Sequence, residues 1–87
     1  MIQHYLPLVH ALIDAFLFLE SSGDNEVNPD SAVRCMENIS SSLLALSRAD
    51  QLALRLHFEE IANATGDPAV SEFVRKLPNM IGLADMN

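Results

Sequence analysis

The chain has 87 residues, of which 12 are acidic and 5 are basic, so its formal net charge is −7. This length fits one small domain, and we expect residues 1–87 to fold as a unit. An acidic protein repels phosphate groups, which argues against nucleic acid and membrane partners and favours a protein partner with a basic surface. Cys35 is the only cysteine and the N-terminus lacks the basic segment of a secretory signal, so we expect a cytoplasmic protein.

The most apolar stretch, residues 5–21, is predicted to be the first helix. Its apolar side chains spread around most of the helical wheel, and only His10, Asp14 and Ser21 form a polar strip. Gly23 is predicted to close this helix in a left-handed conformation. The stretch is too short and too interrupted for a standard membrane span of about 20 residues. Because a helix that is apolar on nearly all sides is rarely left in water, we expect its own chain or another chain to enclose it.

Two further helices are predicted at residues 29–46 and 48–65. Asn28 followed by Pro29 is a strong start signal, with an N-cap side chain and a proline at the first helical position. Ser47 begins a sequence typical of a capping box at the start of the next helix. Apolar residues recur at helical spacing on one face of the first of these segments. In the second they form two stripes, so this helix is expected to contact neighbours on two sides. The stripes are Ala49, Leu52, Ala53 and Leu56, and Leu54, Phe58, Ile61 and Ala62.

The fourth predicted helix spans residues 68–77. Asp67 and Pro68 repeat the start signal, and Pro78 is predicted to end the helix. The apolar residues 80–83 are then expected to fold back as a turn. No strand-like alternation persists along the chain, so the sequence predicts an all-α bundle of four helices around the hydrophobic N-terminal helix.

Two side chains on these helices have simple structural interpretations. Arg55 and Glu59 lie four residues apart and are expected to pair on the solvent side of the third helix. Cys35 is flanked by Val33 and Met36, which predicts a partly buried and unreactive thiol.

The candidates for chemistry are two short pairs, His10 with Asp14 and His57 with Glu60. Imidazole and carboxylate groups can bind transition metals or transfer protons. A carboxylate-bridged di-metal bundle, however, needs a Glu from each of two helices and a Glu-x-x-His from each of two others, which this chain does not offer. Nucleophile motifs and glycine-rich phosphate loops are also missing. We therefore predict a protein that is not an enzyme and has no cofactor, with a small metal-binding or hydrolytic bundle that uses these four residues as the alternative.

Acidic residues gather in the first predicted loop and on the outward face of the second helix, at Asp24, Glu26, Asp30 and Glu37, with Arg34 the only cation among them. A solvated surface is the simpler interpretation, and a docking surface for a basic protein is the functional one. In small size, acidity, helical content and lack of catalytic groups, the chain resembles in general character the bacterial immunity and antitoxin proteins, which bind and block a toxic enzyme. We predict an interaction module, with an inhibitor or immunity protein as one form.

The apolar excess of the first helix also predicts self-association. In a four-helix arrangement each helix normally turns only one stripe toward the core, so Leu17 and Phe18 are expected to remain exposed. Leaving a large apolar side chain in water forgoes about 1.5–3 kcal/mol. A homodimer with the first helix against its symmetry mate, through Leu17 and Phe18, would cover this surface.

Overall fold

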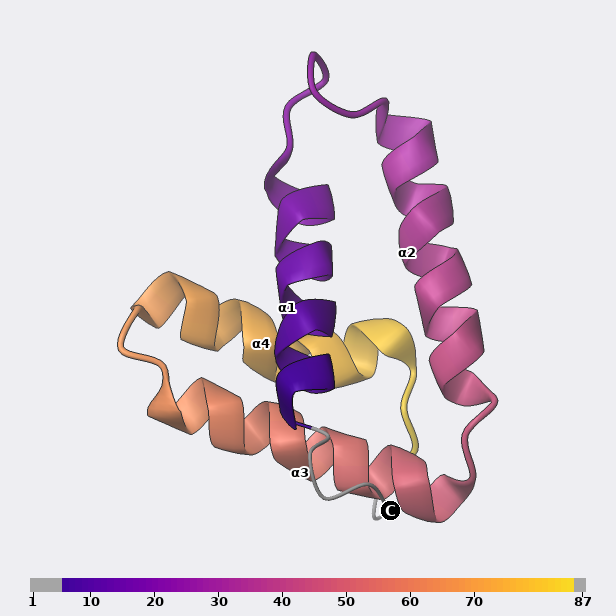
Figure 1. Cartoon of the computed structure of the whole chain (residues 1–87), viewed down its shortest axis with the longest axis vertical. Helices are drawn as coiled ribbons and strands as arrows, with labels where there is room; N and C mark the ends of the chain where they lie inside the picture. Colours follow the sequence, from indigo (N-terminus) through magenta and orange to yellow (C-terminus); the bar gives the residue numbers. More distant parts are fainter. Residues whose placement is uncertain (1–5, 86–87) are drawn as a thin grey trace.

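The computed structural model describes residues 6–85, which form four α-helices and contain no β-strand (Figure 1). In chain order the helices are α1 (Leu6–Ser21), α2 (Pro29–Leu44), α3 (Arg48–Ala64) and α4 (Pro68–Ile81). The all-α class with four helices is therefore confirmed. Tyr5, the predicted first residue of α1, lies outside the described residues. Within the described range, no helix combines the length and the hydrophobicity that crossing a membrane requires.

The predicted start signals act as helix caps. The side chain of Asn28 accepts hydrogen bonds from the amides of Asp30, at 3.0 Å, and Ser31, at 3.2 Å. Ser47 Oγ accepts from the third residue of its helix at 3.1 Å, and Asp67 caps α4 in the same way. These contacts satisfy amides that have no partner inside the helix, which explains why the predicted starts of α2, α3 and α4 agree with the structure.

The end of α1 differs from the prediction, because Gly23 does not adopt the left-handed conformation. Instead, the hydroxyl of Ser21 donates to the carbonyl oxygen of Leu17, and that of Ser22 donates to the carbonyl oxygen of Phe18. The two serines thus provide hydrogen bonds for the last turn of the helix, so a left-handed residue is not needed there.

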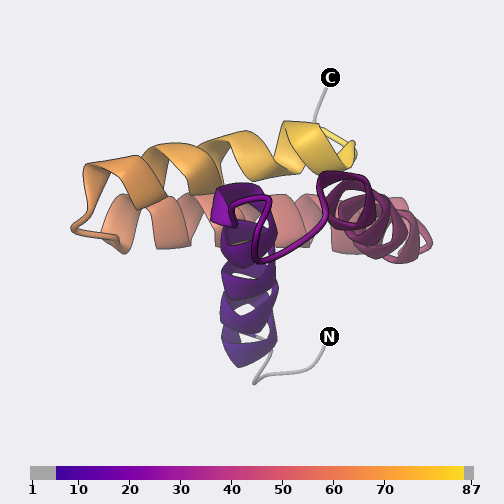
Figure 2. The same cartoon turned by 90° about the horizontal axis from the view of Figure 1, so that it is seen from above.

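The helices are arranged as two antiparallel hairpins. The helices α3 and α4 lie side by side, and α1 runs across them in both views (Figures 1 and 2). The helix α2 leads back from the tip of the first hairpin and contacts α1 and α4. The closest pairing is between α3 and α4, so the second hairpin is the platform on which the first one rests.

One hydrophobic core joins the hairpins. Its buried members come from α1, α3, α4 and the segment after α4, namely Val9, Ile13, Phe16, Leu54, Phe58, Ile61, Ala62, Val74, Leu77, Ile81 and Leu83. The helix α2 adds only partly buried side chains to this core, Met36, Ile39 and Leu43. The helix α1 buries one stripe, so its own chain encloses only one side of it.

The prediction that Pro78 ends the fourth helix is wrong. The helix continues through this proline to Ile81 and stops at Gly82, which has a φ of 89° and a ψ of 27°. The amides of Gly82 and Leu83 both donate to the carbonyl oxygen of Pro78 at 3.0 Å, which closes the helix. An internal proline costs about 3 kcal/mol, and the burial of Pro78, Ile81 and Leu83 offsets this cost.

The segment after α4 is fastened to α3 by polar contacts. Arg55 donates to the carbonyl oxygen of Leu83 at 2.8 Å and to that of Ala84 at 2.9 Å. The amide of Ala84 donates to Gln51 Oε1 at 2.9 Å. The predicted ion pair between Arg55 and Glu59 is not found among residues 6–85, because the guanidinium of Arg55 is directed to the segment after α4.

Candidate protein-interaction surface

All four predicted partner-binding acids are exposed. Asp24 and Glu26 lie in the loop between α1 and α2, and Asp30 lies in the first turn of α2. Glu26 has a local role, because its carboxylate accepts the amide of Gly23 at 3.1 Å. Asp30 also stabilises its own helix, because a negative charge near a helix N-terminus interacts favourably with the dipole.

Glu37 differs from the other three acids because it lines a groove. The groove lies between α2 and α4 and has a volume of about 390 Å³. Its lining combines this one ionisable group with mainly apolar side chains, Phe16, Val33, Met36, Leu44 and Met80, and with the hydroxyls of Ser40 and Ser41. Neither ion pair found among residues 6–85 involves Glu37. We call this hollow the α2–α4 groove.

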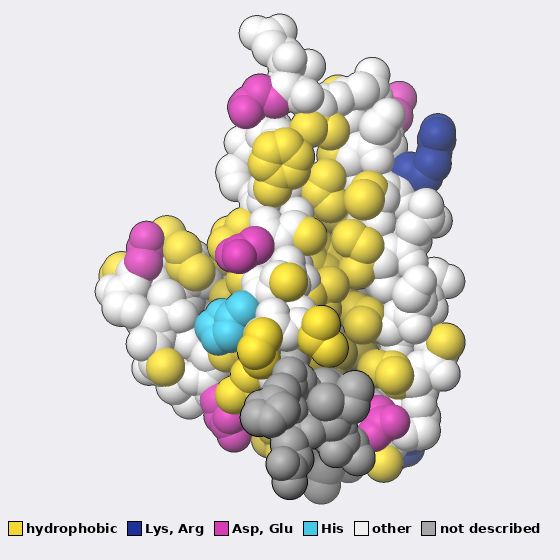
Figure 3. Space-filling view, viewed as in Figure 1, with side chains coloured by type: hydrophobic (Ala, Val, Ile, Leu, Met, Phe, Trp, Pro, Cys, Tyr) yellow, Lys and Arg dark blue, Asp and Glu magenta, His cyan; other side chains and the backbone are white. Residues whose placement is uncertain are grey.

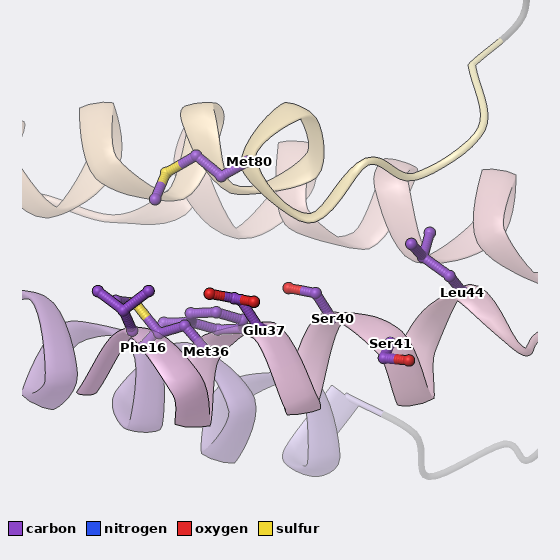
Figure 4. A pocket seen from close by; sticks show the side chains of 8 residues that line it. Phe16, Met36, Glu37, Ser40, Ser41, Leu44 and Met80 are labelled. Atoms are coloured by element: carbon purple, nitrogen blue, oxygen red, sulfur yellow. The ribbon is translucent and has the colours of Figure 1, made fainter. Parts of the chain in front are cut away.

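Figure 4 shows how the side chains lie in the α2–α4 groove. Glu37 and Ser40 project from α2 toward α4, and Met80 projects from α4 on the opposite wall. Phe16, only 2% exposed, contributes from the core side of the groove. Met80 is 51% exposed, so the groove is open to a partner.

A second apolar surface lies along the seam between α1 and α2, where hydrophobic side chains gather in the space-filling view (Figure 3). A shallow hollow there is lined only by apolar residues, Leu8, Val9, Leu12, Leu43, Leu46 and Leu54. Of the two predicted dimer residues, Phe18 is 56% exposed, whereas Leu17 is half-buried and packs against the core. The expected exposure is therefore confirmed for Phe18 and wrong for Leu17, which packs against the core.

The four residues of the metal-binding alternative do not form one site. His57 Nδ1 lies 3.8 Å from Glu60 Oε2 within α3, and His10 lines a shallow hollow on which Glu60 also borders. Asp14 is exposed, and the structure gives no ion pair between it and His10. In the part of the chain that the structure describes, no three His, Cys, Asp or Glu side chains are placed to hold a metal ion together. The geometry of these four residues within one chain therefore gives the alternative no support.

Two features of α2 and α4 differ from the predictions made from the sequence. Cys35 is exposed and not partly buried as predicted, since the α2 face that carries it is turned to solvent. Met80 lies in α4 and not in the predicted turn, because the helix continues past Pro78, and the sequence therefore does not predict the groove wall opposite Glu37. The α2 wall of the groove does have a signal in the sequence, because Val33, Glu37 and Leu44 are spaced to lie on one side of the helix.

Comparison of this chain with models of protein families, with curated proteins and with solved structures finds no match.

Proposed function

We propose that this protein is a non-enzymatic interaction module that binds a basic protein partner through Asp24, Glu26, Asp30 and Glu37. The supporting observation is that all four carboxylates are exposed along the first loop and α2, and that none of them has an ion-pair partner among residues 6–85. Exposed charges of one sign raise the rate and the selectivity of association with an oppositely charged surface. An inhibitor of the immunity or antitoxin type is one form of such a module, and a reducing cytoplasm suits the exposed thiol of Cys35.

The test compares two charge-reversed variants with the wild type. In one variant the four proposed acids are replaced by lysine, and in the other the exposed acids Asp14, Glu20, Glu59 and Glu72 are replaced. The variants have equal net charge, and the control also loses the exposed ion pair of Glu72 with Lys76, which contributes little to stability. A partner captured from the native cell should lose affinity for the first variant, keep most of it for the second, and dissociate as salt rises. Binding that ignores both the first variant and ionic strength would exclude this surface.

We also propose that a homodimer covers the exposed apolar side of α1. Phe18 and Leu8 are 56% and 61% exposed on α1, and pairing two copies through a two-fold axis would bury them in a self-complementary contact. Burying a large apolar side chain contributes about 1.5–3 kcal/mol, and exposed apolar patches mark association sites.

Light scattering at micromolar concentration tests the dimer. The expected mass is twice that of the 9.6 kDa chain. Phe18→Glu should lower this mass, whereas Leu56→Glu, at a side chain that is 60% exposed on α3, should leave it unchanged. A monomer for the wild type would refute the dimer, and an equal effect of both variants would move the contact away from α1.

A further inference from the structure

The α2–α4 groove has the features of a groove that binds a helix. Its two walls are helices, and the buried ring of Phe16 contributes from α1 beneath them. Val33, Leu44 and Met80 stand exposed along the walls instead of being covered by the chain itself. Grooves between helices commonly bind the apolar face of an amphipathic helix.

The length of the groove fits two to three turns of a partner helix. Along α2, Val33, Glu37 and Leu44 fall on one row at helical spacing. The eleven steps from Val33 to Leu44 correspond to about 16 Å at a rise of about 1.5 Å per residue. Apolar side chains at positions i, i+4 and i+7 of a partner helix span about 10 Å, so all three can lie within the groove.

The negative charge of Glu37 in the groove favours a ligand that carries a cationic side chain. Glu37 is the groove's only ionisable lining group, and it lies between Val33 and Leu44 on the row. Unlike Glu26 it accepts no backbone hydrogen bond in the described structure, and Arg34, the only cation of α2, does not line the groove. Asp30 lies one turn before Val33 on the same side of the helix, which extends the negative potential beyond the groove.

Other occupants fit these observations less well. A second copy of this chain has the same net charge of −7, and in a two-fold contact at this groove it would bring its own Glu37 close to the first, which is unfavourable. An extended strand binds by adding to a sheet edge, and residues 6–85 contain no strand. Met36 and Met80 are flexible and polarisable side chains that adapt to apolar groups of different shape, which suits a helical ligand.

We propose that the α2–α4 groove binds an amphipathic helix of the protein partner, with apolar side chains between Met36 and Met80 and a lysine or arginine on Glu37. This inference rests on the proposed function and deepens it, because it specifies the partner's binding segment and assigns the apolar contact. Phe16, Val33 and Leu44 complete the apolar contact.

The test uses a displayed library of helical peptides of about 16 residues, a length of about 24 Å. Positions i, i+4 and i+7 are restricted to large apolar residues, and the other positions are randomised. Peptides selected on the wild-type protein should carry lysine or arginine beside the apolar face. Their binding should perturb the amide signals of α2 and of the end of α4 in NMR spectra of the labelled protein. Failure to select any peptide, or signals that change only along the α1–α2 seam, would overturn the proposal.

Variants then separate the apolar contact from the charge contact. Met80→Glu should weaken the selected peptides by about 10-fold or more, since the burial of one large apolar side chain is lost. Leu56→Glu is the matched control, because Leu56 is exposed on α3 and does not line the groove. Glu37→Lys should reverse the selection toward acidic peptides, and unchanged affinity in Met80→Glu and Glu37→Lys would overturn the proposal.

Affinity measurements with the natural partner test the groove separately from the acidic surface of the proposed function. A partner that ignores Met80→Glu and Glu37→Lys but loses affinity when the loop acids Asp24 and Glu26 are reversed would overturn the groove and leave the acidic surface standing. A partner with the opposite response would confirm the groove and remove the loop acids from the proposed function. In both cases, circular dichroism of each variant should show the wild-type helix content, because the substituted side chains are exposed.

Discussion

Replacing Arg55 by methionine should destabilise the domain by about 2–4 kcal/mol. The guanidinium donates to two part-buried carbonyl oxygens, those of Leu83 and Ala84, and hydrogen bonds of charged groups contribute about 1.5–3 kcal/mol each. The partial exposure of Arg55 lowers the sum, and its exposed bond to Asn79 at 3.2 Å adds little. Methionine keeps the apolar stem, so the loss reports mainly the polar contacts.

Urea denaturation followed by circular dichroism measures this loss as a lower midpoint at an unchanged slope. The change is large for a chain of 87 residues, whose total stability is on the order of 4–13 kcal/mol. Arg75→Met is the matched control, because Arg75 makes an exposed bond to Asn63, and we expect it to cost less than about 0.5 kcal/mol. Equal losses of stability in the two variants, or a loss below about 0.5 kcal/mol for Arg55→Met, would show that Arg55 does not hold the segment after α4 in place.

Three further substitutions test the fold. Phe58→Ala should cost about 3–5 kcal/mol in calorimetry, because Phe58 is fully buried in the core, and a loss below 1 kcal/mol would contradict its central place. Gly82→Ala should cost about 1–2 kcal/mol in denaturant titration, since its positive φ is unfavourable for a residue with a Cβ atom, which otherwise meets Leu44 only at an ordinary 3.9 Å. Asn28→Ala should cost about 1 kcal/mol through loss of the α2 cap, seen as faster amide exchange in the first turn of that helix, whereas Asn28→Ser should retain most of the stability.

Local signals explain which parts of the fold could be predicted. The starts of α2 and α4 depend on a cap side chain and a proline that are adjacent in sequence, and both were located correctly. Helical spacing alone placed Leu54, Phe58 and Ile61 on one of the two apolar stripes of α3, and these three residues lie in the core. In the other stripe, Leu56 is 60% exposed. These features depend on residues within one or two turns of each other, so the sequence contains them directly.

Long-range packing decided the features that could not be predicted. Pro78 remains inside α4 because distant parts of the chain bury Ile81 and Leu83, and no local pattern reports that burial. Arg55 binds residues about 28 positions later in the chain in place of its neighbour Glu59. The α2–α4 groove was missed for the same reason, since one wall depends on the continuation of α4 to Met80.

The two walls of the α2–α4 groove belong to different hairpins, so a ligand that contacts both walls must also hold the hairpins together. A ligand that binds only when the two hairpins are packed together stabilises that packed state by RT ln(1 + [L]/Kd). This is about 2.7 kcal/mol when the ligand concentration is 100 times Kd. Apart from the small Ala32, the core side chains of α2 are only partly buried, so we expect separation of this helix to cost less than separation of the others. Occupancy of the groove should therefore slow amide exchange throughout α2. Binding of the partner would thus make the packing of the two hairpins more rigid.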